Sequence, residues 1–479
     1  MKRKRRLITM LLAAVMTVAL VLTACGGGSG GGGGGGDAAA PAQSGGGSGG
    51  GVVEKGYQSD MEKDVITIRA VRPSTGVNAI FEQTSFGPQY RMWADEINQA
   101  GGVYVKSLDR QVKVDVQVYD DGSDITKTTQ LFEQIVASEK PDLVLAPEGT
   151  ASLFACSPIA QKYDYLLLAA EGGAKELENY LPPLGDNTNT FSILSYSETQ
   201  VPALIKFFEE QGVESVYCVY VDDLHGTEYW GYTKSELEKI GIDIKGSESA
   251  PLEGDFDADA VVNNAMRSGA DAFLVYTYPG NSIPITASAA KLGYNPKMYL
   301  VGPGGCYDFF GAFSLGDPTN IALDGMIGWG AWNEKSTAHG TKAKEYSEHF
   351  QQYWIDKGLF WKNADGSFGD IGGGDTVFQD WWGHICYYSV MQILQQALEN
   401  AGELMDDGRI NNLTLVDYIA NNSFDTVMHT ELRFTNNILL DDMYLGNIGQ
   451  WQNGVFEVID VDDRRTADPW YPKPPWPSE

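Results

Sequence analysis

Motifs for metal and nucleotide chemistry are missing from this 479-residue sequence. Its five histidines are scattered without HExxH or other ligand spacing, so we expect no zinc site. The stretch after the first predicted strand, Pro73-Ser74-Thr75-Gly76, is not a GxGxxG phosphate loop, and GxxxxGK followed by Ser or Thr does not occur. The sequence therefore predicts no catalytic residue, no metal and no cofactor.

Cysteine and positive charge are also scarce. Cys156, Cys218, Cys306 and Cys386 are widely spaced without a CxxC pair, which argues against a zinc site or a dense disulfide scaffold and leaves open whether any two of them pair. The chain has 34 Lys plus Arg against 64 Asp plus Glu. Because such an acidic surface repels phosphate groups, we expect neither a nucleic-acid partner nor electrostatic docking on anionic lipid.

The N-terminus is typical of an export signal that ends in a lipid anchor. Residues 2–6 are basic, Leu7–Leu22 is apolar, and the predicted signal peptide is 1–24. Leu22-Thr23-Ala24-Cys25 resembles the lipobox of bacterial lipoproteins, in which the cysteine becomes the lipidated first residue. The alternatives are a plain secretory peptide cut after Ala24 and a membrane anchor, although the apolar run is shorter than the roughly 20 residues that span a bilayer.

Glycine dominates the segment after Cys25, which predicts a tether over residues 25–63. As a flexible coil its reach is about 35 Å, from roughly 5–6 Å times the square root of its length. The rest of the chain contains 11 Trp within a sequence that is 43% hydrophobic, enough for a large core. We expect this folded body at the extracytoplasmic face of the cell membrane, held there by lipid on Cys25.

From Val65 the pattern alternates short β-branched runs with amphipathic stretches. This β-α order predicts two α/β lobes, each a parallel sheet flanked by helices. A long apolar helix, 380–401, should pack on one lobe, and short strands within 430–459 should return the chain to the other. The expected strands are 65–71, 112–120, 142–147, 216–221, 242–244 and 272–278, and the expected helices are 87–100, 126–138, 227–240 and 258–268.

Seven segments in order carry a resemblance to a known family. They are Ala94–Val103, Val118–Asp124, Ser157–Tyr163, Val221–Tyr229, Gly254–Val275, Ala290–Pro296 and Ile448–Ile459. Together they resemble the branched-chain amino acid type of ABC-transporter substrate-binding protein, which has the type I periplasmic-binding-protein fold. The resemblance implies a two-lobed flytrap with ligand in the cleft, a hinge of about three crossings, and an ABC permease as partner of a monomer.

The lobe boundaries follow from this resemblance and the restart of the β-α pattern. We expect lobe 1 over residues 64–189 and 325–430, and lobe 2 over residues 190–324 and 431–479. No role is assigned to the insertion 359–382.

The cleft of such a fold is made by loops at the carboxyl ends of strands, where helix N-termini favour anionic groups. By position, Thr150, Ala151 and Gly172 match the family's carboxylate-binding hydroxyl and backbone groups, although Thr150 could equally be a helix N-cap. Phe81, Tyr276 and Tyr278 are expected to form walls, with the protein core as the alternative for each. His225 lies in a predicted cleft loop and is a further candidate contact.

One departure from the family leaves the ligand open. Members that bind α-amino acids tend to carry an acidic residue where this chain has Gly304, a candidate ligand-binding position that would set specificity if the ligand has no ammonium group. Because an unpaired ammonium in a closed cleft is costly, the anion must come from elsewhere or the ligand lacks an ammonium. The candidate acids, each of which could instead be a solvated helix-start carboxylate, are Glu171, Asp222, Asp223 and Asp308.

The sequence thus predicts a non-enzymatic, extracytoplasmic solute-binding lipoprotein that delivers a small polar solute to an ABC permease. The solute could be an amino acid, an amide, a small carboxylate or an aromatic compound. Two alternatives remain open, a sensory lipoprotein that signals to a membrane partner and a tethered hydrolase that uses His225.

Overall fold

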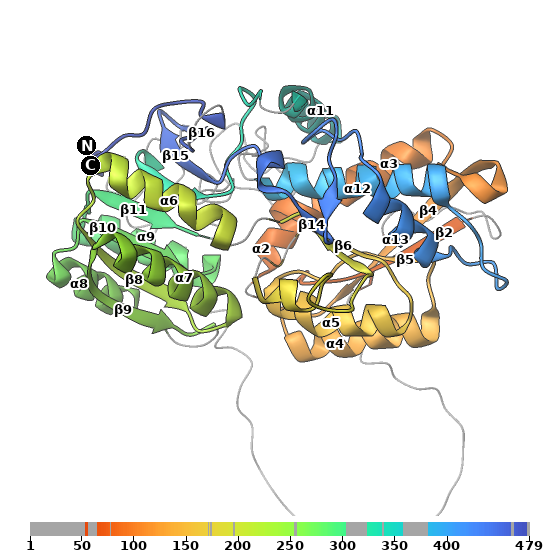
Figure 1. The fold of residues 1–479 in the computed structure, drawn as a ribbon, viewed down its shortest axis with the longest axis horizontal. Helices are drawn as coiled ribbons and strands as arrows, with labels where there is room; N and C mark the ends of the chain where they lie inside the picture. The colour runs from red at the N-terminus through yellow and green to blue at the C-terminus, as the bar shows by residue number, and fades with distance from the viewer. Residues whose placement is uncertain are drawn as a thin grey trace, which may run out of the picture. The chain divides into compact units, whose positions relative to one another are not determined.

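The computed structural model describes residues 53–55, 65–76, 78–170, 172, 175–194, 197–252, 256–302, 323–337, 340–357, 382–460 and 464–476. Figure 1 shows the order of its elements along the chain. The predicted signal peptide, Cys25, nearly all of the tether and nearly all of the insertion 359–382 lie outside the described residues. None of the helices in the described ranges is long and apolar enough to cross a membrane.

The first lobe contains a sheet in which β2 lies between β4 and β5 and runs parallel to both. Side chains of β2 alternate between faces, so that Ile66, Ile68 and Ala70 enter one core cluster and Val71 another. The sheet strands are β1 (Val53–Lys55), β2 (Val65–Arg72), β3 (Val103–Val105), β4 (Arg110–Asp120) and β5 (Leu143–Val144). Its helices are α2 (Ala79–Phe81), α3 (Gly87–Gln99), α4 (Ile125–Gln134) and α5 (Thr150–Lys162).

Strand β1 lies inside the segment that the sequence predicts to be tether. It pairs antiparallel with β4, with Val53 opposite Tyr119 and Lys55 opposite Gln117. These three residues therefore form an edge strand of the first-lobe sheet instead of flexible coil.

A second, four-stranded sheet of this lobe joins distant parts of the chain. Strands β6 and β7 are parallel, and β14 pairs with β7 after an interval of more than 240 residues. Asn437 strengthens this join, because its amide Nδ2 donates to the carbonyls of Thr188 and Thr190 at 2.9 and 3.0 Å. The strands are β6 (Leu167–Ala169), β7 (Thr190–Ser192), β13 (Phe434–Thr435) and β14 (Ile438–Leu439).

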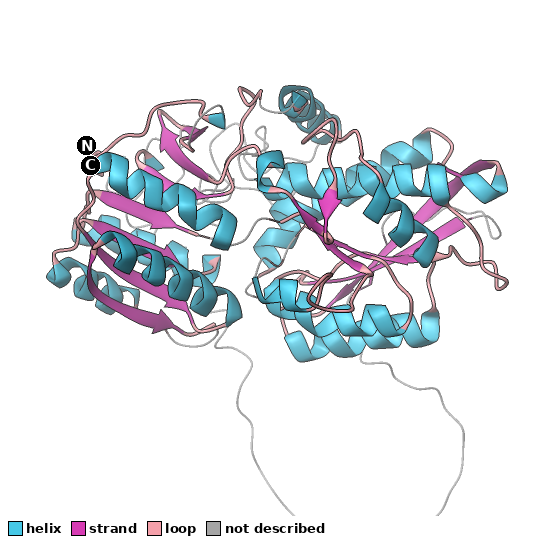
Figure 2. Cartoon of the chain, in the orientation of Figure 1, coloured by secondary structure: helices cyan, strands magenta, loops and turns pink. Residues whose placement is uncertain are grey.

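The second lobe is built on a seven-stranded sheet with helices on both faces (Figure 2). Alternate residues of β10 divide between two cores: Phe273 and Val275 pack with residues of α8 and α9, whereas Leu274 and Tyr276 pack with residues of α6 and α7. The strands in sheet order are β16 (Val455–Val458), β15 (Ile448–Gln452), β12 (Met326–Trp329), β11 (Met298–Val301), β10 (Ala272–Tyr276), β8 (Ser215–Val221) and β9 (Asp243–Ala250). The helices are α6 (Ser197–Gln211), α7 (Leu224–Ile240), α8 (Ala258–Ser268) and α9 (Pro279–Leu292).

The chain passes between the lobes three times, which agrees with the predicted hinge. It crosses after β7, returns after β12, and crosses again between β14 and β15. The returning stretch includes α12, which packs on α3 and β3 of the first lobe as the sequence predicts for a long apolar helix. Its helices are α11 (Ala343–Asp356), α12 (Trp382–Ala401) and α13 (Asn412–Asn421).

Strand pairing differs from the predicted lobe boundaries at three points. Strand β7 belongs to a first-lobe sheet although residue 190 was expected to open lobe 2. Strand β12 pairs with β11 and β15 of the second lobe although residue 325 was expected to reopen lobe 1. The β13–β14 hairpin belongs to the first lobe although residue 431 was expected to reopen lobe 2. All three depend on long-range pairing, which local patterns do not encode.

Two predicted strands end earlier than expected. Strand β10 stops at Tyr276 because Tyr278 has become the N-cap of α9, with Pro279 as the first helical residue. Strand β5 is short, and Pro147 cannot donate a ladder hydrogen bond. Each early end places the following residues in a loop at the carboxyl end of its strand.

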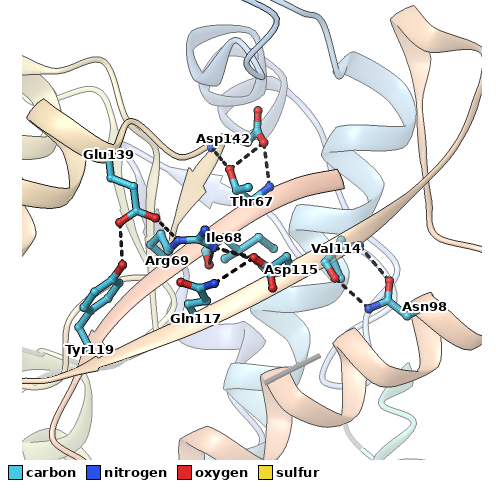
Figure 3. A network of polar contacts seen from close by, with 10 residues as sticks. All are labelled: Thr67, Ile68, Arg69, Asn98, Val114, Asp115, Gln117, Tyr119, Glu139 and Asp142. Carbon is cyan, nitrogen blue, oxygen red and sulfur yellow. Dashed lines mark hydrogen bonds and ion pairs between the residues drawn. The ribbon is translucent and has the colours of Figure 1, made fainter. Parts of the chain in front are cut away.

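A polar network lies on the first-lobe sheet away from the carboxyl ends of its strands (Figure 3). Arg69 on β2 forms ion pairs with Asp115, at 3.2 Å, and with Glu139. Asp142 accepts hydrogen bonds from the Thr67 N–H at 2.8 Å and from the Ile410 N–H at 3.0 Å. The network therefore fastens the returning chain before α13 to the start of the sheet.

Candidate functional site

The three residues predicted to bind a carboxylate come together at the start of α5. Gly149, with φ of +84°, is the N-cap, and Thr150 is the first helical residue, so the interpretation of Thr150 as the cap is wrong. Gly172 also has φ of +84°, and a Cβ there would lie 2.9 Å from Leu153 Cδ2 and 3.3 Å from the Gly149 carbonyl oxygen. Only glycine allows this close approach to the helix N-terminus, whose first-turn N–H groups and positive dipole end favour an anion.

The predicted wall residues of the second lobe have different environments. Tyr276 is fully buried beside Tyr229 and Trp329, and its hydroxyl lies 3.1 Å from Thr233 Oγ1. It is thus a core residue, the alternative that the sequence left open. Tyr278 is only partly buried, and lies at the carboxyl end of β10 where such a fold binds ligand.

Tyr278 is held by Asp223 and covered by His225. Its hydroxyl donates to Asp223 Oδ2 at 2.9 Å, while Asp223 Oδ1 accepts from the Gly226 N–H at 2.8 Å and caps α7. The His225 ring stacks on Tyr278 with 5.7 Å between centroids. Burial lowers the pKa of His225 to about 4, against the opposing pull of Asp223, so the imidazole is neutral at pH 7.

In the first lobe, Phe81 lies in α2 and neighbours Phe86, which contacts a buried arginine that was not among the predicted site residues. The Phe81 side chain is buried, and its ring is 6.3 Å from that of Phe86. Phe86 in turn lies 5.4 Å from the guanidinium of Arg72, which has 0% exposure, and Tyr387 lies 5.5 Å from it. Phe81 is therefore buried next to Phe86, one of the two rings that contact Arg72 at the end of β2.

Arg72 is shared between two carboxylates. Its Nε donates to Glu82 Oε2 at 2.8 Å, and its Nη2 lies 3.8 Å from Glu148 Oε2. Nη1 donates to the Ala146 carbonyl at 2.9 Å. Because Glu148 precedes Gly149 and Thr150 directly, Arg72 positions the turn that opens α5.

The charge of Glu148, in the first lobe, affects the Tyr278 hydroxyl of the second lobe. The pKa of the Tyr278 hydroxyl is raised well above its usual range, first by burial, then by the charge of Asp223 and its hydrogen bond, and also by the charge of Glu148. Glu148 and Asp223, from opposite lobes, thus act on the same phenol.

The lobes also touch at a second place, at the starts of α6 and α7. The backbone N–H of Lys175, from the first lobe, donates to Glu228 Oε1 at 2.7 Å, and Lys175 Nζ lies 3.3 Å from Glu198 Oε1. The Ser197 hydroxyl lies 2.7 Å from Glu198 Oε2 and 3.0 Å from Glu228 Oε1. Burial, followed by a hydrogen bond with Glu176, raises the pKa of Glu228 to about 8.

Several predicted positions cannot be placed. Glu171, Gly304 and Asp308 lie outside the described residues, as does Cys306. Cys156, Cys218 and Cys386 are buried free thiols, so none of these three pairs with another. Within the described ranges, no group of three or more His, Cys, Asp or Glu is arranged to hold a metal ion.

A family of known proteins matches most of this chain. A family model described as periplasmic binding protein matches residues 65–450. The chain belongs to the periplasmic binding protein family. Family membership confirms the predicted fold class, implies an extracytoplasmic location, and confirms the prediction of a binding protein that is not an enzyme.

Solved structures of periplasmic binding proteins share this fold at low sequence identity. An extracellular ligand-binding receptor from Rhodopseudomonas palustris HaA2 is 15% identical, with a TM-score of 0.63 over 82% of this chain and 99% of that one. The leucine-binding protein LivK from Thermotoga maritima is 14% identical, with a TM-score of 0.60 over 82% and 97%. A solute-binding protein from R. palustris in complex with 4-hydroxybenzoate is 13% identical, with a TM-score of 0.62 over 86% and 99%.

The periplasmic-binding-protein fold explains why the missed residues matter. Arg72 and Glu148 stand at the carboxyl ends of β2 and β5, the edge where this fold binds ligand. Arg72 carries only a weak sequence signal, because it is the second arginine of a strand that already contains Arg69. Glu148 carries a weaker one, since it lies two residues before Thr150.

Proposed function

We propose that this protein is the lipid-anchored solute receptor of an ABC importer. It captures a small polar solute between its lobes as a monomer and delivers it to a permease in the membrane. The observation that carries the proposal is the packing of α5, whose N-terminus is narrowed by Gly172, against α7 of the other lobe, where His225 stacks on Tyr278. Thr150 and Ala151 would bind the anionic end of the solute, as the α5 N-terminus favours.

Two structural neighbours support an anionic end on the solute. The T. maritima protein is named for leucine and the R. palustris protein was solved with 4-hydroxybenzoate, and both molecules carry a carboxylate. In this mechanism the solute contacts both lobes only in the closed state, so its differential affinity shifts the population toward closure. The permease then recognises the closed surface.

Calorimetric titration of the full chain in mild detergent tests solute capture. The titrants are amino acids, amides, polyamines, short carboxylates and hydroxybenzoates. A bound solute at 100 times its dissociation constant should add about 2.7 kcal/mol of stability, which a melting curve resolves. Absence of heat and of a melting shift across the whole panel would contradict the proposal.

The lipid anchor is tested separately by Cys25→Ser. We expect the wild-type chain in the membrane fraction and the variant in the soluble fraction, because a lipid provides the attachment. Equal membrane association of both chains would reject the anchor without affecting solute binding.

A further inference from the structure

The C-terminal segment, residues 464–476, lies beyond the stretch that the family model matches, which ends within β15. Its far end is fastened to the second lobe. The Lys473 N–H donates to the Lys297 carbonyl at 2.6 Å, and the Trp476 indole N–H donates to the Tyr294 carbonyl at 2.7 Å. The segment is therefore a fixed part of the second lobe, and its near end can hold whatever it contacts.

The near end of the segment contacts the second hinge crossing, the chain between β12 and α11. Thr466 lies at the contact: its hydroxyl accepts from Asn333 Nδ2 at 3.1 Å and donates to Glu457 Oε2 at 2.6 Å. The same hydroxyl accepts from the Val458 N–H at 2.9 Å, and the Thr466 N–H donates to the Val458 carbonyl at 2.8 Å. Thr466 thus joins β16 to the hinge crossing.

Glu457 ties the same groups together. Its side chain is buried, and it forms an ion pair with Lys335 of the hinge crossing. It also lies 3.2 Å from Asn333 Nδ2. A buried carboxylate is costly unless donors satisfy it, and here the donors come from both the hinge crossing and the C-terminal segment. Loss of the Thr466 hydroxyl therefore weakens the hold on Asn333 as well.

The residue before Asn333 is held by the other lobe. Trp332 is buried, and its ring lies 5.6 Å from that of Tyr346 on α11. The Tyr346 hydroxyl donates to Gln89 Oε1 on α3 at 2.5 Å, which fixes Tyr346 to the first lobe. Neighbouring residues of one hinge crossing are thus bound to opposite lobes.

We propose that Thr466 and Glu457 are positioning residues for lobe closure, which hold the second hinge crossing, through Asn333, in the conformation where the lobes touch. This inference rests on the proposed function, because a solute receptor has to open and close. Loss of the hold frees the crossing and lowers the closed population, since the freed residues gain conformational entropy in the open state. A solute that binds the closed state then binds more weakly by the same factor.

Hydrogen exchange of the full chain in mild detergent, without any solute, tests this inference. The Lys175 N–H donates to Glu228 Oε1 across the lobes, so its exchange rate reports how often the lobes part. Thr466→Val removes the hydroxyl and keeps the shape. We expect it to accelerate Lys175 exchange about 5-fold, the effect of one net hydrogen bond, and to leave the amides of β10 unchanged.

Two further variants separate hinge positioning from general stability. Trp476→Phe is the matched control, because it removes the indole donation at the far end of the segment and should lower the melting temperature without accelerating Lys175 exchange. Asn333→Ser breaks the same link from the hinge side. Combined with Thr466→Val it should accelerate exchange no further than either change alone, because both act through one contact.

The outcomes distinguish this inference from the proposed function, because the exchange measurement needs no solute. Unchanged Lys175 exchange in both hinge variants, equal acceleration in Trp476→Phe, or additive effects in the double variant overturns the inference and leaves solute capture intact. Absence of heat and of a melting shift across the calorimetric panel contradicts solute capture, whatever the exchange rates are.

Discussion

Two arginines three residues apart on β2 have opposite surroundings. Arg69 points to the face where Asp115 and Glu139 lie, so all of its ion pairs are inside the first lobe. Arg72 ends the strand on the other face and pairs with Glu148. The charge of Glu148 in turn contributes to the raised pKa of Tyr278 in the second lobe. Successive side chains of a strand point to opposite faces, so Arg69 and Arg72 lie on different faces of the sheet. Arg72 also ends the strand, at the edge where this fold binds ligand, whereas Arg69 lies within it.

The difference in burial also separates the two arginines. Arg72 and Glu82 have side-chain exposures of 0% and 1%, whereas Glu139 beside Arg69 is 34% exposed. A carboxylate that keeps part of its hydration loses less when its partner is removed. Replacing Arg72 and replacing Arg69 should therefore have different effects on the free energy of unfolding and on solute affinity.

The largest expected effect is that of Arg72→Met. It leaves Glu82 buried without its nearest cation, which should destabilise the fold by about 3–5 kcal/mol. Urea unfolding measures the loss. Glu82→Gln added to this variant should recover part of it, because the stranded charge is then gone. A loss under 1 kcal/mol would refute the assignment of Arg72 as the centre of this group.

Arg69→Met should cost less, about 1–3 kcal/mol, because Glu139 can hydrate. It should leave solute affinity unchanged, since its contacts lie at the far end of the sheet. Unfolding and titration of the same sample give both values. A drop in affinity beyond twofold would show that the Arg69 network does reach the site.

Gly172→Ala tests the crowding at the α5 N-terminus. Positive φ costs an alanine about 1–2 kcal/mol, and the added Cβ also meets Leu153. The variant should lose stability and solute affinity together. Gly241→Ala is the matched control, because Gly241 has φ of +78° with nothing within 4 Å of an added Cβ. It should lose stability alone, and equal affinity losses would contradict the role of Gly172.

The alternation of strand and helix patterns predicted both lobes, because each buried strand can be recognised from the apolar residues of its own short segment. The site was predicted only in part. Tyr276 and Tyr278 read alike in the sequence, and only Pro279, which starts α9, separates a core residue from a cleft residue. Arg72 and Glu148 are 76 residues apart, and nothing local indicates that their side chains meet across parallel strands.

Two buried neutral histidines, one in each lobe, should make the stability of the fold depend on acid pH. Burial lowers the pKa of His225 to about 4 and that of His384 to about 3, below the ordinary 6.5. As pH falls from 6.5, the unfolded chain takes up protons that the native chain does not, so stability present above 6.5 is lost. His225→Gln and His384→Gln should each reduce this loss in melting curves recorded from pH 7 to pH 4.

Only one of these histidines should affect binding. His384 stacks on Phe350 within the first lobe, whereas His225 stacks on Tyr278. Titration at pH 7 should show weaker solute binding for His225→Gln and no change for His384→Gln. The reverse order, or no effect of either, would contradict a solute contact at His225.

The smallest expected effect concerns Glu228, where the lobes touch away from the arginines. Burial raises its pKa to about 8, against an ordinary 4.5, even though the hydrogen bond from the Lys175 N–H favours the ionised form, so the buried position is most stable when Glu228 is protonated. A group with a raised pKa stabilises the arrangement below 4.5, and that contribution is lost as pH rises through 8. Because Glu228 keeps partial access to water, screening limits the size of the change.

We predict that closure of the lobes buries Glu228 beside Lys175, so solute affinity of the wild-type chain should decline modestly between pH 5 and pH 8.5. Glu228→Gln, which stays neutral and still accepts the Lys175 N–H, should flatten the decline, whereas Glu139→Gln in the Arg69 network should not. An unchanged slope in Glu228→Gln would mean that the pH dependence arises elsewhere. A flattened slope would show that closure is coupled to proton uptake at the lobe boundary, while the far end of the first-lobe sheet contributes only to folding.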